Sequence, residues 1–181
     1  NGSSQSSKDA TCTMYNGGTS CSYTLPSEVS SSSGPSSTEY KGVSTSASST
    51  TTTTSYTSAN SKYYAVYTKT VKGTFYYNSN TTSGSLTVST ATASGTRTST
   101  TNGTTYSVSE GSITIPSAVT GSVGKYNSTY KGVSTSLSSM GSSSVTTANT
   151  TYYANYSKAV TIYYPTSTSA VSSGTFYRNE Y

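Results

Sequence analysis

Apolar and polar residues alternate along short segments of the chain, and the clearest case covers residues 63–71. Successive side chains of a β-strand point to opposite sides, so a period of two predicts a strand with one packed face. Every second residue of this segment is aromatic, aliphatic or a long lysine: Tyr63, Ala65, Tyr67, Lys69 and Val71. We expect this face to pack and Lys69 to lie at a sheet edge or over a ring.

Further short segments rich in Tyr, Thr and Val are also predicted to be strands, since these residues fit a pleated, half-buried surface. Gly, Pro, Asn and Ser-rich turns separate them, as in an all-β protein. The segments are 11–15, 20–25, 42–47, 74–77, 85–91, 104–108, 112–115, 132–137, 160–164 and 174–178. The polar runs 30–37 and 48–55 are predicted to be loops or edge segments.

The chain repeats part of its own sequence about 90 residues later. Residues 22–29 (SYTLPSEV) resemble 112–119 (SITIPSAV), and residues 40–46 recur unchanged at 130–136 as YKGVSTS. Residues 59–69 (ANSKYYAVYTK) match 148–158 (ANTTYYANYSK). The repeat predicts a tandem duplication, and its length suits a small β-sandwich better than a solenoid.

The predicted organisation is therefore a polar tail (1–10) and two sandwich domains, 11–80 and 84–181, with the boundary in the polar stretch 78–84. The repeat keeps Tyr64 as Tyr153 on the second strand face but changes Val66 to Asn155. The face that starts with Tyr63 recurs at Tyr152 and keeps its residue types, so it is predicted to be the packed one.

One repeated motif is out of step with the others. Residues 73–78 (GTFYYN) recur as 174–179 (GTFYRN), 101 positions later, so the second copy holds about a dozen extra residues within 161–173. Strands near both chain ends could pair or exchange head to tail, because an open sheet edge offers unpaired backbone groups.

Composition argues against catalysis. The chain contains 44 Ser, 38 Thr and 19 Tyr among 181 residues, with no His and only five acidic residues. Without histidine there is no serine triad or imidazole metal site, and five scattered acids leave little for acid–base pairs. We expect no enzyme activity, metal or cofactor.

The net charge of +5 comes from basic residues spread thinly along the chain, which argues against nucleic-acid binding. No apolar run is long enough to span a membrane.

Cys12 and Cys21 enclose the turn signature Asn16-Gly17-Gly18. Two strands joined there would bring the sulfurs within bridging distance. We predict a disulfide, and with it an oxidising setting outside the cytoplasm; two unpaired thiols are the alternative.

The hydroxyl-rich sequence offers many acceptors for sugars. Asn-x-Ser/Thr sequons occur at Asn1, Asn80, Asn102, Asn127, Asn149 and Asn155, although a chain so rich in Ser and Thr carries several by chance. Thr52, within the run TTTTT, is a candidate for O-linked sugar. Covalent glycans are thus possible partners.

Tyrosine clusters raise two further hypotheses. Tyr64 and Tyr153 could form a sugar-stacking surface, although adjacent tyrosines alternate between strand faces and one of each pair is expected in the core. A Lys–Asn isopeptide crosslink at Lys69 or Lys158 is disfavoured, because the two copies share no acidic residue to assist proton transfer.

Tandem units of about 90 residues with the motifs SxT[LI]PS, YKGVSTS and YYAxYxK resemble the immunoglobulin-like repeats of microbial cell-surface proteins. The composition, with few charged residues and many Ser, Thr, Tyr and Asn residues, is also similar to that of subunits of extracellular filaments and pili. The resemblance implies an exported structural subunit that pairs with copies of itself. A secreted carbohydrate-binding or adhesive module and a spacer stalk are the alternatives.

Overall fold

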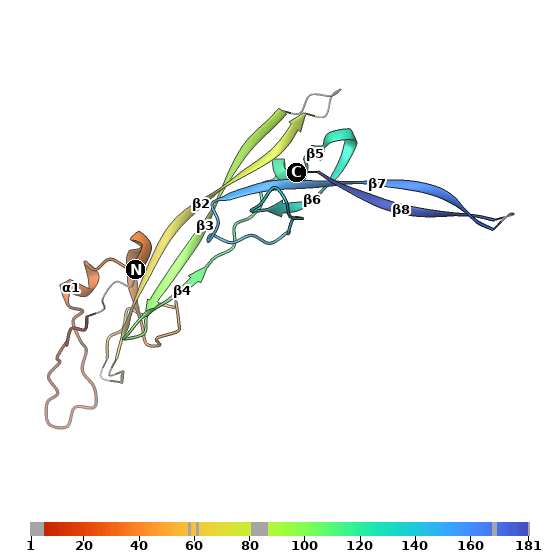
Figure 1. Ribbon diagram of the computed structural model, residues 1–181. Coiled ribbons are helices and arrows are strands. Elements are labelled where there is room, and N and C mark those ends of the chain that lie inside the picture. Colours follow the sequence, from red (N-terminus) through yellow and green to blue (C-terminus); the bar gives the residue numbers. More distant parts are fainter. Residues whose placement is uncertain (1–5, 58, 61, 81–86, 168–169, 181) are drawn as a thin grey trace. The chain divides into compact units, whose positions relative to one another are not determined.

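The computed structural model describes residues 6–57, 59–60, 62–80, 87–167 and 170–180, with the backbone alone for residue 80 and residues 170–180. These residues form an all-β fold with four single-turn helices (Figure 1). The strands are β1 (Glu39–Ser44), β2 (Tyr64–Asn80), β3 (Thr87–Thr101), β4 (Tyr106–Glu110), β5 (Val123–Gly124), β6 (Ser128–Ser134), β7 (Thr151–Ser167) and β8 (Ala170–Glu180). The helices are α1 (Ser27–Ser30), η1 (Pro35–Ser37), α2 (Ser117–Thr120) and η2 (Lys125–Asn127).

The strands belong to one open mixed sheet with the order β4-β3-β2-β7-β6-β5. Strand β1 pairs with β2, and β8 pairs with β7. The β2–β7 pair is parallel, whereas β1–β2, β3–β4, β5–β6, β6–β7 and β7–β8 are antiparallel. The all-β class is confirmed, and the two predicted immunoglobulin-like sandwiches remain a prediction.

The chain divides into two compact units. Unit 1 contains residues 1–70 and 96–111, and unit 2 contains residues 71–95 and 112–181. The predicted boundary, 78–84, falls partly on the end of β2 and partly outside the described residues. The predicted domain ranges remain a prediction.

Several strand predictions differ from the structure. The predicted segments 63–71 and 74–77 are not separate: from Tyr64 onward they belong to one long strand, β2, because Lys72 and Gly73 continue the strand without a turn. Residues 11–15 form no strand, and in 20–25 and 112–115 only Ser22 and Ser112 make isolated bridges. The other candidates overlap β1, β3, β4, β6, β7 and β8.

The same strand pairings occur in both units. In unit 1, Tyr40, Gly42 and Val43 pair with Tyr67, Val66 and Ala65. In unit 2, Tyr130, Gly132 and Val133 pair with Tyr156, Asn155 and Ala154. Each ladder shifts register between its tyrosine and its glycine, and these glycines have φ angles of 153° and 135°. A side chain at either glycine would be strained, because L-residues rarely adopt such φ values.

In each unit, a tyrosine hydroxyl on the long strand, β2 or β7, forms a hydrogen bond with a serine two residues after the short helix α1 or α2. The hydroxyls of Ser32 and Tyr67 lie 2.8 Å apart, and those of Ser122 and Tyr156 lie 2.7 Å apart. The Tyr67 and Tyr156 rings also pack edge to face on Tyr40 and Tyr130, at centroid distances of 6.2 and 6.4 Å.

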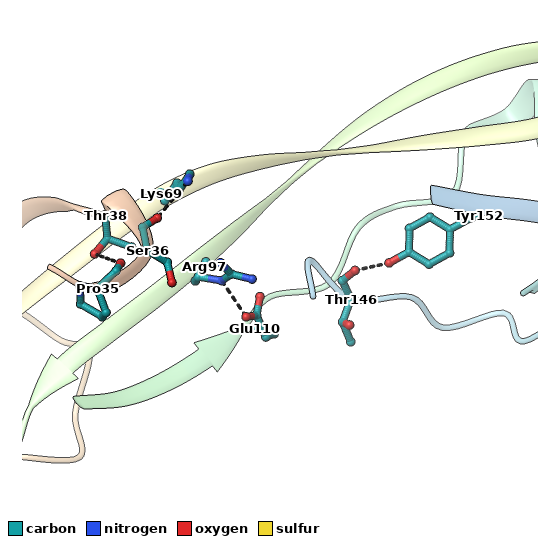
Figure 2. Close-up of polar contacts among 8 residues, drawn as sticks. All are labelled: Pro35, Ser36, Thr38, Lys69, Arg97, Glu110, Thr146 and Tyr152. Atoms are coloured by element: carbon teal, nitrogen blue, oxygen red, sulfur yellow. Dashed lines mark hydrogen bonds and ion pairs between the residues drawn. The ribbon is translucent and has the colours of Figure 1, made fainter. Parts of the chain in front are cut away.

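The lysines of the two strands neither lie over rings nor point freely into water. Lys69 Nζ donates to the carbonyl oxygen of Ser36 at 2.9 Å (Figure 2). Lys158 Nζ donates to the carbonyl oxygen of Tyr126 at 2.5 Å. Ser36 and Tyr126 both have φ near 55°, so each lysine satisfies a carbonyl at a left-handed position of the 3-10 turn.

The core of unit 2 is built from Val and Tyr together with single Ile, Phe and Ala residues. Its buried members are Phe75, Ile113, Val119, Val133, Val145, Tyr152, Ala154 and Tyr156. The prediction of a single packed face is wrong at mid-strand, since Val66 and Asn155 on the second face are also fully buried. At Asn155 the segment that bridges to Val133 through Ser142 lies close by, since a Cβ added at Gly141 would be 2.7 Å from Asn155 Oδ1.

Replacement of Tyr156 by Phe tests the hydroxyl network. The Tyr156 hydroxyl contacts Ser122 and also accepts a hydrogen bond from the Asn78 backbone N–H at 2.9 Å. Tyr156→Phe removes the partner of the buried Asn78 N–H, whereas the Ser122 hydroxyl still donates to the Val119 carbonyl. The substitution should lower the free energy of unfolding by about 1–3 kcal/mol in urea titrations.

The matched control is Tyr130→Phe, in the ring that packs against Tyr156. The buried Tyr130 hydroxyl has no hydrogen-bond partner, so its removal should be neutral or stabilising. Equal losses for the two variants would contradict this assignment of the hydroxyl contacts.

Candidate assembly surface

The second half of β7 forms a two-stranded arm with β8. Within the described strands, β7 pairs with β6 over residues 153–157 and with β8 from Tyr156 to Ser167. Figure 1 draws β7 and β8 as one long antiparallel hairpin. We call residues 158–167 of β7 and 170–180 of β8 the arm.

Apolar side chains of the arm are exposed on both faces. Val160, Ile162, Tyr163 and Tyr164 expose 47, 51, 75 and 47% of their surface. Every residue from Lys158 to Ser167 is exposed. An isolated two-stranded ribbon is at best marginally stable in water, and clustered exposed apolar side chains mark interaction surfaces. The arm therefore has the properties of a segment that acts by binding another surface.

A different hairpin, formed by residues 71–95, is inserted into unit 2. Residues Thr74, Phe75 and Tyr76 of β2 pair in parallel with Thr151, Tyr152 and Tyr153 at the start of β7. The Thr74 N–H donates to the Thr150 carbonyl at 2.7 Å. This segment adds a strand to the edge of β7.

The side chains of the inserted segment complete the core of unit 2. Phe75 is fully buried and stacks on Tyr152, with ring centroids 5.0 Å apart and planes 17° apart. Tyr76 stacks on Tyr153 at 5.5 Å and 15°. A Cβ added at Gly73 would lie 3.0 Å from the Ile113 side chain, so the absence of a side chain there permits the close approach.

The two predicted contact tyrosines do not form an open platform. Tyr64 is half-buried at the start of β2. Tyr153 is half-buried, and the ring of Tyr76 covers one of its faces. Tyr76 itself is 38% exposed. The stacked pair of Tyr76 and the predicted contact residue Tyr153 is therefore a partly exposed aromatic surface of unit 2. Sequence reasoning missed Phe75 and Tyr76 as stacking partners, although GTFYYN was recognised as a repeated motif.

Cys12 and Cys21 are paired as a disulfide, with Cα atoms 5.9 Å apart. The turn between them forms at Asn16 and Gly17, where Gly17 has φ 86° and the Gly18 N–H donates to the Tyr15 carbonyl at 2.8 Å. Such pairs persist in oxidising compartments.

The candidate glycosylation residues differ in accessibility. Asn102, Asn127 and Asn149 are exposed, and Thr52 is half-buried. The Asn102 side-chain oxygen accepts hydrogen bonds from the Thr104 and Thr105 backbone N–H groups at 3.0 and 2.6 Å. Asn155 is fully buried, so its amide is out of reach of a transferase in the folded chain. Asn1 and the side chain of Asn80 lie outside the described residues.

The ion pair and the shifted tyrosine pKa values among the described residues are explained by strand pairing and burial. Arg97 and Glu110 form a partly buried ion pair at 2.6 Å between β3 and β4 (Figure 2). Burial raises the pKa of Tyr40, Tyr106 and Tyr130, and neighbouring tyrosines add to the rise, which keeps these phenols neutral. The described residues contain no group of three His, Cys, Asp or Glu side chains that could hold a metal ion. They also contain no helix long and apolar enough to cross a membrane.

Comparison of the chain with protein-family models, with curated proteins and with solved structures finds no match.

Asn155 gives a stability test that uses unit 1 as its template. Both polar atoms of the buried Asn155 side chain have no hydrogen-bond partner, and the corresponding residue of unit 1 is the buried Val66. A buried amide without partners costs free energy, so Asn155→Val should raise the free energy of unfolding by about 1 kcal/mol or more in urea.

The reverse change provides the control. Val66→Asn should lower stability by a similar or larger amount, because it buries an amide in an apolar place. Destabilisation by Asn155→Val would show instead that the Asn155 amide is satisfied in solution.

Proposed function

We propose that this chain is a structural subunit of an extracellular filament, pilus or surface layer, in which copies join head to tail through strand addition or end-to-end packing. The single observation that carries the proposal is the arm, with Val160, Ile162, Tyr163 and Tyr164 exposed on a ribbon that pairs within β7 and β8. A ribbon of this kind is stabilised when it adds to another sheet.

The finer architecture belongs to the same proposal. The pairings around Gly42 and Gly132 recur at offsets of 90 residues for the glycine strands and 89 for their partners, as expected of two tandem immunoglobulin-like domains that arose by duplication. The Cys12–Cys21 pair supports export to an oxidising, extracellular setting. The low content of charged residues, 8%, favours dense packing of like subunits, because little like-charge repulsion has to be overcome.

An arm variant tests self-assembly. The double substitution Ile162→Thr with Tyr164→Thr keeps the β-propensity of the arm but removes its apolar surface. We expect it to shift the wild-type assemblies to monomers, as measured by light scattering after size exclusion and by negative-stain imaging.

The matched control is Val108→Thr, an exposed valine of β4 that is 51% accessible, and it should assemble like the wild type. A wild-type chain that stays strictly monomeric up to millimolar concentration would overturn the proposed function.

The second candidate function is a carbohydrate-binding or adhesive module. The stacked, partly exposed pair of Tyr76 and Tyr153 favours it, since aromatic faces stack on sugar rings. If this function holds, Tyr76→Ala and Tyr153→Ala should each abolish binding on a glycan array, whereas Tyr15→Ala, in a loop of unit 1, should not. Unchanged binding by the first two variants would reject the module.

A further inference from the structure

Corresponding residues of the two units differ in burial on one side of the core. In unit 2 they are at most 5% exposed: Ile113, Val119, Val145, Tyr152 and Ala154. In unit 1 the residues 89 or 90 positions earlier are only half-buried: Tyr23, Val29, Tyr56, Tyr63 and Ala65. Their backbones are held alike, because Tyr23 N–H donates to Tyr56 and Ile113 N–H donates to Val145. Unit 1 thus has the framework of this side of the core but covers it less completely.

The start of the central strand shows the same difference. Strand β7 begins at Thr151, whereas β2 begins two corresponding positions later, at Tyr64. Thr151 and Tyr152 are strand residues because β2 pairs with them in parallel. Lys62 and Tyr63, which correspond to them, belong to no strand in the described part of the chain. Lys62 and Tyr63 thus extend beyond the strand, whereas Tyr64 pairs with Ser44 and the Ala65 carbonyl accepts a hydrogen bond from the Thr101 hydroxyl at 3.4 Å.

The residue types at the uncovered side suit an intermolecular contact. Where unit 2 has the permanently buried Ile113 and Val145, unit 1 has Tyr23 and Tyr56. Tyrosine is enriched at protein interfaces, because its ring offers apolar surface while its hydroxyl tolerates water before binding.

The Tyr63 ring is held in place by contacts within unit 1. Its hydroxyl accepts from the Thr57 backbone N–H at 2.8 Å, and its ring packs edge to face on Tyr56 at 5.8 Å. The Tyr152 hydroxyl likewise donates to the Thr146 carbonyl (Figure 2), and Tyr152 is the ring on which Phe75 stacks. A fixed ring costs little additional entropy when a partner covers it.

The chain contains a second copy of the segment that covers unit 2. Residues 73–78, GTFYYN, supply Phe75 and Tyr76 to unit 2, and the same motif recurs as GTFYRN at 174–179 in β8. This second motif lies in the arm, whose described apolar side chains are exposed. The chain therefore has a half-buried edge in unit 1 and a second copy of the covering motif, which pairs with β7 along the arm.

We infer that the arm of one copy adds to the Lys62–Tyr64 edge of unit 1 in a second copy, and covers Tyr63 as the hairpin 71–95 covers Tyr152. The inference rests on the proposed function and specifies its joint. Donor and acceptor are different surfaces, so each joined pair keeps one arm and one edge available. Such a head-to-tail contact builds an open chain of subunits instead of a closed dimer.

Complementary variants test the joint. The donor-deficient protein carries Ile162→Thr with Tyr164→Thr, and the acceptor-deficient protein carries Tyr63→Lys, or Tyr23→Lys as a second version with a different effect on folding. Far-UV circular dichroism establishes that each variant is folded. Each alone should self-associate at least about tenfold more weakly than the wild type, since a central interface residue is lost.

Mixed together, the two proteins should form a one-to-one heterodimer that grows no further, as measured by native mass spectrometry. Wild-type assembly with unimpaired assembly of both acceptor variants would overturn the joint while leaving the proposed function intact. A monomeric wild type would instead overturn the proposed function itself.

Thiol crosslinking locates the arm without disturbing either core. Lys62→Cys and Ile162→Cys alter exposed residues, and the native Cys12–Cys21 disulfide does not react with maleimides. A short bis-maleimide should join the two variants into a dimer, whereas Val108→Cys in place of Lys62→Cys should give none. Equal yields from Lys62→Cys and Val108→Cys would also overturn the joint.

Discussion

The insertion of Phe75 beside Tyr152 is the interaction on which the order of unit 2 depends. Val and Tyr dominate a core with few aliphatic residues, so one fully buried phenylalanine supplies a large part of its apolar surface. The parallel pairing of residues 74–76 with 151–153 fixes the position of Phe75 and turns the start of β7 into regular strand. Without that segment, the same side of unit 1 is left half-buried.

This dependence links the fold to the proposed assembly. A unit that receives its last strand from another part of the sequence is complete only when a donor is present. Unit 2 receives its donor from residues 71–95 of the same chain, and the arm offers a further donor whose side chains from Lys158 to Ser167 are exposed. Ser and Thr residues give the chain a surface of low charge. Within each unit, a hydrogen bond between a tyrosine and a serine hydroxyl links the long strand to the segment after the short helix.

The sequence predicted the all-β class, the repeat and the cysteine pair from local patterns, because alternation and turn signals act over a few residues. It could not predict that β2 continues through Lys72 and Gly73, since that depends on the parallel partner beginning at Thr151. The sequence also could not predict the burial of the Asn155 side chain, because an Asn in a sequon is normally interpreted as a surface residue. The motif GTFYYN was visible as a repeat, but only the burial of Phe75 showed what the motif does.

Hydrogen exchange of the intact chain, in dilute and in assembled form, tests the central claim most directly. The account predicts that backbone amides of Lys62 and Tyr63, which lie outside any strand, exchange rapidly in the dilute protein and become protected on assembly. Amides of residues 151–153, already paired with β2, should be protected in both states and serve as the internal reference. An assembled protein in which Lys62 and Tyr63 exchange as fast as in dilute solution would contradict the account.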